Sequence, residues 1–229
     1  MSASRSREQR QAAFTLLELL AVVAIIGILA AIVIPTTAAV RVSALRARSR
    51  VQLVQWALAV ELFREEYGAY PAFPVSAKVN AGAATALSGV HPYHDLLAGR
   101  RRDGSALPQT AGPAVEGVPP PEAQNLRRVA FVRFATGDLF GSDAPTPAEV
   151  GLLHDAFGNT DLVVLVDRNE DGWINAADYP AWPVVSPPDA PGRRLAPAEP
   201  IGAGIRTGVL LYGAPPGAFT AGDLIRNTP

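Results

Sequence analysis

The apolar residues divide the chain into a strongly hydrophobic N-terminal segment and a longer region of mixed character. Residues 14–35 read FTLLELLAVVAIIGILAAIVIP and contain a single charged residue, Glu18. About 20 apolar residues are needed for a helix to span a bilayer, so this run predicts a transmembrane helix. Residues 1–13 carry three arginines against one glutamate. This positive flank predicts a cytoplasmic N-terminus and an exported remainder.

A second apolar pattern covers residues 36–67 and predicts an amphipathic helix. Its members recur at steps of three or four residues, or multiples of these, which places them on one helix face. They are Val42, Leu45, Leu53, Trp56, Val60, Phe63 and Tyr67. Gly68 and Pro71 predict the helix end, because glycine accepts a left-handed conformation and proline cannot continue the helix. Pro35 predicts a kink or loosened turn before this half of the helix.

The rest of the chain predicts a small sheet packed on that helix. Residues 68–127 are rich in Ala, Gly, Pro and Val, and predict loops with a short helix at 94–97. Three short runs rich in β-branched or aromatic residues then predict strands. These runs are 129–134 (VAFVRF), 162–166 (LVVLV) and 209–212 (VLLY). An antiparallel sheet within residues 128–229, packed on the helix, gives an α+β fold class.

Two clusters of basic side chains fall in the loop-rich region. The run Arg100–Arg102 precedes Asp103-Gly104, a pattern typical of a surface turn. Nucleic-acid binding is not expected there, because aromatic residues do not alternate with the arginines. His91 and His94 lack a further clustered ligand, so a loop is favoured over a metal site.

Composition narrows the classes of function. The 229 residues carry a formal net charge of −1, so no overall field attracts nucleic acid or acidic surfaces. Cysteine is absent, which excludes disulfides and thiolate metal sites. The sequence has no nucleophile motif, glycine-rich phosphate loop or acid/base constellation, so we do not expect an enzyme.

Three interpretations of the N-terminus compete. A secretory signal peptide could be cleaved after the small residues Thr37-Ala38-Ala39. A plain signal anchor would remain uncleaved. Neither accounts for Glu18, because an acidic side chain in hydrocarbon costs about 2.5–3.5 kcal/mol and normally has a partner.

The run Ala13-Phe14-Thr15-Leu16-Leu17-Glu18 resembles the prepilin cleavage and methylation site of type IV pilins and type II secretion pseudopilins. The resemblance implies that a prepilin peptidase cuts between Ala13 and Phe14 and methylates the new amine. It also implies that Glu18 pairs with the N-terminal amine of a neighbouring subunit during assembly. Gly27 and Pro35 lie where pilins commonly have these residues, whereas Ala13 replaces the usual glycine.

Residues 167–178 predict a calcium loop of the EF-hand type. Side-chain oxygens at positions 1, 3, 5 and 9, a carbonyl at 7 and a carboxylate at 12 match the twelve-residue pattern. The corresponding residues are Asp167, Asn169, Asp171, Asn175, Trp173 and Asp178. Gly172 permits the sharp turn, and Ile174 is expected to hold the loop against the core. Aspartate at position 12 resembles dockerin loops, and an acidic turn without metal is the alternative.

The favoured function is that of a structural subunit. The run Glu65–Pro71 (EEYGAYP) and the segment Asp155–Thr160 resemble parts of type II secretion major pseudopilins, and the family resemblance also implies C-terminal calcium. It implies an inner-membrane protein with a periplasmic domain. Its partners would be itself, the prepilin peptidase, the secretion inner-membrane platform and minor pseudopilins. The alternatives are a minor type IV pilin for adhesion, motility or DNA uptake, a membrane-tethered enzyme, and a calcium-binding module.

Overall fold

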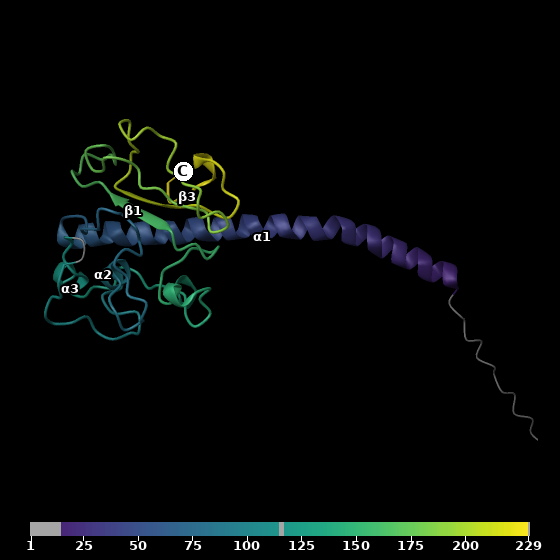
Figure 1. Ribbon diagram of the computed structural model, residues 1–229, viewed down its shortest axis with the longest axis horizontal. Helices are drawn as coiled ribbons and strands as arrows, with labels where there is room; N and C mark the ends of the chain where they lie inside the picture. Colours follow the sequence, from purple (N-terminus) through teal and green to yellow (C-terminus); the bar gives the residue numbers. More distant parts are fainter. Residues whose placement is uncertain (1–14, 115–116, 229) are drawn as a thin grey trace, which may run out of the picture. The chain divides into compact units, whose positions relative to one another are not determined.

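The structure is a computed structural model that describes residues 15–114 and 117–228, without the side chains of residues 33–36 and 38. The chain divides into two compact units, Met1–Ala44 and Leu45–Pro229, which are described separately. The helices are α1 (Leu16–Tyr67), α2 (Pro92–Ala98) and α3 (Pro121–Gln124), with 3-10 turns at Thr136–Asp138, Pro147–Glu149 and Ala221–Asp223. The strands are β1 (Leu162–Val166), β2 (Val209–Gly213) and β3 (Ile225–Arg226) (Figure 1).

Helix α1 ends where the sequence predicts. Gly68 follows Tyr67 with φ of +78°, and its N–H donates to the carbonyl of Arg64 at 2.8 Å. This left-handed conformation closes the last turn at no cost to a residue without Cβ. The helix assignment continues through Pro35, whose side chain lies outside the described residues, so the kink there stays a prediction.

The core of the C-terminal unit forms between α1 and one face of the sheet. Leu53, Trp56, Val60 and Phe63 are each at most 4% exposed, which confirms this part of the predicted apolar face, and we call these four residues the inner stripe. Of the other predicted members, Val42 is 45% exposed, and Leu45 and Tyr67 are only partly buried. They share one apolar cluster with side chains from β1 and β2, namely Leu162, Val164, Val166, Val209 and Leu211. The predicted α+β architecture, a long helix packed on a small antiparallel sheet, is therefore confirmed.

The sheet has apolar cover on both faces. Its order is β1-β2-β3, and β1 pairs antiparallel with β2 in the register Val164↔Leu211. The alternate residues Val163 and Leu165 belong to a second cluster with loop residues such as Ile174. Because both faces of the sheet are covered, every residue of β1 is apolar, and apolar and polar residues do not alternate along it.

The predicted strand at 129–134 is wrong. This segment instead crosses the end of α2, where the N–H groups of Phe131 and Val132 both donate to the carbonyl of Leu97. The free edge of β1 pairs with the segment at Lys78, whose neighbours exchange hydrogen bonds with Leu162 and Val164. The aromatic side chains of 129–134 therefore pack against the core without joining the sheet.

Helix α2, predicted at 94–97, begins from a buried histidine. The Nδ1 atom of His91 accepts the N–H of His94 at 3.2 Å, so Nε2 carries the proton that is donated to Asn80 at 3.0 Å. Burial, together with the nearby charge of Arg102, holds the pKa of His91 well below its usual value. The neutral ring is thus a helix cap.

The arginine run after α2 corrects the expected surface turn. Arg100 is exposed, but Arg101 is 8% exposed and donates from Nη1 to Asp95 at 2.8 Å. Arg102 is partly buried and donates to the carbonyls of Ala84 and Ala86 at 2.7 and 2.8 Å. Two of the three guanidinium groups therefore hold loops together instead of facing solvent.

Candidate functional site

The N-terminal turn of α1 holds Glu18 in a capping box. The N–H and Oγ1 of Thr15 both donate to Glu18 Oε2 at 2.9 Å, and the N–H of Glu18 donates to Thr15 Oγ1 at 3.2 Å. This reciprocal pattern satisfies helix donors that otherwise lack partners. The capping box was not predicted from the sequence, although the spacing Thr-Leu-Leu-Glu is typical of one. Ala13 and Phe14 lie outside the described residues.

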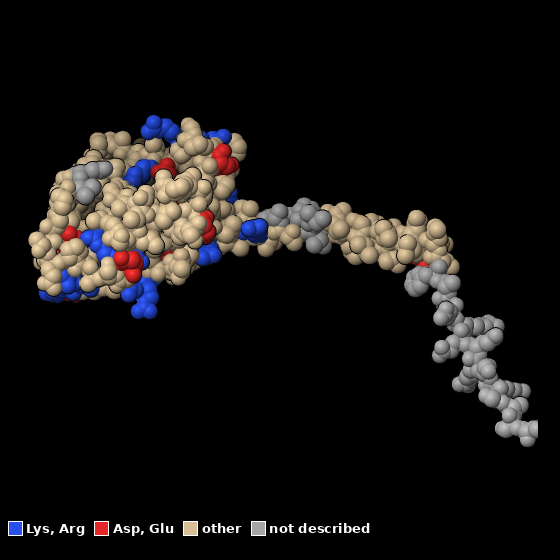
Figure 2. Space-filling view, turned by 60° about the horizontal axis from the view of Figure 1, so that its bottom comes forward, with Lys and Arg blue, Asp and Glu red and all other residues tan. Residues whose placement is uncertain are grey.

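The N-terminal unit carries an apolar helix surface. Its exposed large apolar side chains have exposed fractions of 45–83%: Leu16, Leu17, Leu19, Leu20, Val22, Val23, Ile25, Ile26, Ile28, Leu29, Ile32, Val40 and Val42. On the face seen in Figure 2, charged side chains gather on the C-terminal unit and are sparse on this segment. In the described part of the chain, no helix was found to be both long and apolar enough to cross a membrane.

The part of α1 in the C-terminal unit has a second, outward apolar stripe. Val51, Val54, Leu58 and Leu62 follow each other at steps of three or four residues and are 57%, 45%, 57% and 38% exposed. Residues at these steps lie on one helix face. This stripe lies on the same helix as the buried stripe of Trp56 but is not covered by the fold of its own unit. We call these four residues the outer stripe.

The loop at 167–178 is folded around its own side-chain oxygens. Asp167 accepts the N–H of Gly172 at 2.7 Å through Oδ2, and Asp178 accepts the N–H of Arg168 at 2.8 Å through Oδ1. Asp171 Oδ1 accepts the N–H of Trp173 at 2.8 Å. Oxygens of Asn169 and Asn175 accept the N–H groups two residues further along, at 3.1 and 2.7 Å.

Two further features agree with the loop pattern. Gly172 has φ of +86°, which supplies the sharp turn at position 6. Ile174 is fully buried and exchanges two backbone hydrogen bonds with Ile205, each 2.9 Å long. The expectation that Ile174 holds the loop against the core is thereby confirmed.

The fit of calcium to this loop rests on its donors. Carboxylate and amide oxygens with a backbone carbonyl at Trp173 are the ligand types that calcium takes. However, within the described residues no group of three or more His, Cys, Asp or Glu side chains is arranged to hold a metal ion. The three loop carboxylates instead accept backbone N–H groups. Calcium binding stays a prediction.

The turn before β1 is held by a buried carboxylate. Asp155 is 1% exposed, and its Oδ1 accepts the N–H groups of Phe157 and Asn159, each at 2.9 Å. Burial raises the pKa of Asp155, and these hydrogen bonds oppose the shift. Asn159 in turn donates to the carbonyl of Ala214 beyond β2, at 2.9 Å. The turn thus fixes the start of β1 in the sheet.

A protein-family model matches part of the chain. Residues 9–34 match the prokaryotic N-terminal methylation motif, a segment that contains Ala13, Phe14 and Glu18. No curated protein and no solved structure matched the chain. The motif supports a type IV pilin-like protein, and it implies membrane association and polymerisation into a fibre in general terms.

Proposed function

We propose that this chain is a structural subunit of a type II secretion pseudopilus, and that it has no catalytic role. The observation that carries the proposal is the outer stripe on α1, which leaves four large apolar side chains exposed on a well-packed unit. The outer stripe follows, along α1, the helix segment that matches the methylation motif. The apolar side chains of that segment are exposed as well. Apolar side chains that face water do not stabilise a single copy of the chain.

Burial between copies supplies the physical reason for polymerisation. Fully burying a Val or Leu side chain stabilises by about 1.5–3 kcal/mol, so the outer stripe favours contact with a neighbouring α1. A head-to-tail contact that does not close into a ring generates a helical filament. The helices would form the fibre core, and the sheet units would lie outside it.

The N-terminus supplies register and location. In the proposed path, the prepilin peptidase cuts between Ala13 and Phe14, and Glu18 pairs with the amine of a neighbouring subunit in the inner membrane. Pairing relieves the cost of burying each charge alone. The periplasmic domain would then extend the fibre from the inner-membrane platform with minor pseudopilins.

Substitutions on the outer stripe test the proposal. Val54→Gln with Leu58→Gln should leave the chain folded, because both side chains are exposed, but should reduce the yield of sheared fibres at least tenfold. Glu18→Ala should also reduce fibres without preventing membrane insertion. Val75→Gln is the matched control, because Val75 is 72% exposed and lies off the helix. Equal fibre yields for all variants would contradict the proposal.

Deletion of the gene in its host separates secretion from a pilus function. A pseudopilin predicts that folded exported proteins accumulate in the periplasm while motility and DNA uptake continue. Normal secretion with lost adhesion, motility or DNA uptake would assign the chain to the minor type IV pilins instead.

Calcium binding is proposed as a stabilising feature of the same domain. The support is the donor set of the 167–178 loop and the anchoring of Ile174. Asp167, Asn169, Asp171, Asn175 and Asp178 would supply side-chain oxygens, and Trp173 its carbonyl. Bound calcium would neutralise the repulsion among the three carboxylates and hold the loop against the sheet.

A further inference from the structure

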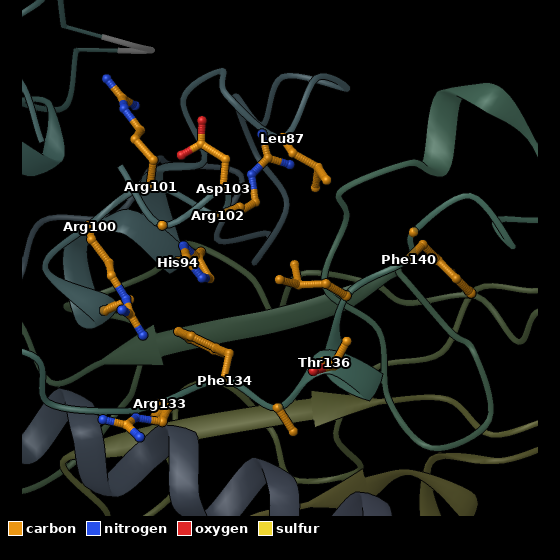
Figure 3. A pocket seen from close by; sticks show the side chains of 15 residues that line it. Leu87, His94, Arg100, Arg101, Arg102, Asp103, Arg133, Phe134, Thr136 and Phe140 are labelled. Carbon is orange, nitrogen blue, oxygen red and sulfur yellow. The ribbon is translucent and has the colours of Figure 1, made fainter. Parts of the chain in front are cut away.

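A cavity of about 370 Å³ opens on the C-terminal unit, and no residue of the outer stripe or of the 167–178 loop lines it. Figure 3 shows the side chains that do. It lies between the segment 100–104 after α2 and the segment 133–141, with Leu87, His94 and Ala98 completing the lining. This volume falls in the range of small-molecule sites. None of the functions discussed above uses it.

The cavity concentrates positive charge in a chain whose net charge is −1. Four arginines line it, against a single carboxylate at Asp103. Arg101 and Arg102 form a fixed part of the wall, because Asp95 and backbone carbonyls hold their guanidinium groups. In addition, the buried Nε of Arg102 has no hydrogen-bond partner among the described residues.

The other two arginines are available to a ligand. Arg100 and Arg133 are exposed, and the described residues offer neither guanidinium group a hydrogen bond or ion pair. Figure 3 shows both side chains on the same side of the cavity, with Phe134 next to them. Guanidinium groups bind carboxylate and phosphate through paired N–H donors. An oxyanion between them would relieve the repulsion of two like charges.

The remaining wall is mixed: Phe134, Leu139 and Phe140 are apolar, and Asp103 and Thr136 are polar. Phe134 lines the cavity, and core rings fix its position, with the ring centres of Trp56 and His94 at 5.6 and 4.8 Å. Phe140 and Leu139 continue this surface. A bare inorganic anion would use the arginines and leave the apolar wall in contact with water. A ligand with a charged group on a ring uses both.

We propose that this cavity binds an anionic saccharide, a sugar unit that carries a phosphate or carboxylate group. Arg100 and Arg133 bind the oxyanion, and the ring of Phe134 packs against the apolar face of the sugar. The site is independent of the proposed fibre function, because it shares no residue with the outer stripe, Glu18 or the calcium loop. Its failure therefore leaves that function untouched.

Calorimetric titration of the full-length protein in uncharged detergent tests the site. The probes are glucose 6-phosphate and glucuronate, with glucose as the neutral counterpart. At least one of the charged sugars should bind, with affinity at least tenfold above that of glucose and falling as salt is added. Comparable binding of glucose, or no binding of either charged sugar, would overturn the proposal.

Two further probes separate the chemical sources of the anion. Inorganic phosphate tests whether an anion alone suffices, and glycerol 1-phosphate represents a phospholipid headgroup. Both should bind at least tenfold more weakly than the favoured sugar. If either equals it, the saccharide assignment is wrong.

Paired variants identify the residues. Arg100→Gln with Arg133→Gln should lower the affinity for the charged sugar at least tenfold without changing the melting temperature. Arg206→Gln is the matched control, because Arg206 is exposed, lies outside the cavity and has no hydrogen bond or ion pair with any described residue. It should leave the affinity unchanged. Equal affinities for the double variant and the control would refute the assignment.

Discussion

Asp95 is the residue on which the loops around α2 depend. It is fully buried, and its Oδ2 accepts the N–H of His91 at 2.9 Å and Nη1 of Arg101 at 2.8 Å. Its Oδ1 lies 3.0 Å from Nδ1 of His94. Removing this carboxylate would leave the guanidinium group of Arg101 buried without a counter-charge. Breaking a buried pair in this way is far more damaging than replacing both partners.

Asp95→Ala should therefore lower the free energy of unfolding by about 3–5 kcal/mol. Urea unfolding, followed by tryptophan fluorescence, to which the buried Trp56 contributes, measures the change. Asp103→Ala is the matched control in the same region, because Asp103 is exposed and bonds only to Ser105 among the described residues. The loss of Asp103 should lower the free energy of unfolding much less than the loss of Asp95, because water replaces its hydrogen bonds. Similar losses for the two variants would contradict the role given to Asp95.

The arginine run shows where reasoning from sequence reaches its limit at this scale. A run of three arginines before Asp-Gly predicts a solvated turn, and the turn is present. The partners that bury Arg101 and Arg102 are a carboxylate six residues earlier and carbonyls at 84 and 86. Pairings of this kind depend on how loops fold together, and no local pattern contains them.

At the scale of elements, periodicity and turn chemistry predicted most of the fold. The inner stripe of α1, its end at Gly68, and strands β1 and β2 all follow from spacing that the chain itself carries. The segment 129–134 has the same strand-like composition, yet it makes its backbone hydrogen bonds to Leu97. The composition of a segment predicts whether its side chains are buried. It does not predict which segment pairs with the open edge of the sheet.

The 167–178 loop is predicted to stabilise the protein when it binds calcium. A ligand at ten times its dissociation constant stabilises by about 1.4 kcal/mol, so millimolar calcium should raise the melting temperature by roughly 3–6 °C over chelator. Asp171→Ala should abolish most of that difference, and magnesium should substitute poorly because it demands a tighter octahedral site. Differential scanning calorimetry measures each shift.

Glu170→Gln is the control for calcium. Glu170 lies in the same loop at a position that supplies no ligand, and its side chain is 43% exposed near Arg64. The variant should keep the calcium-dependent shift. Identical melting temperatures in calcium and chelator for the unaltered protein would leave the loop as an acidic turn without metal.

At the scale of the whole molecule, the two units have different surfaces. The C-terminal unit covers its sheet on both faces, whereas the described N-terminal helix exposes apolar side chains along its length. The sequence indicated this division through the contrast between residues 14–35 and the loop-rich remainder. The sequence did not predict that the outer stripe is exposed, because its exposure depends on which face of α1 packs against the sheet.

The proposed function requires that the chain is made as a prepilin. The methylation motif at residues 9–34 and the outer stripe have a common explanation only if the leader is removed and the helix then packs against other copies. Mass spectrometry of the N-terminal peptide from host membranes tests this most directly. We expect a mature chain that begins with N-methylated Phe14. A chain that retains residues 1–13, or that begins at Val40 after signal-peptide cleavage, would contradict it.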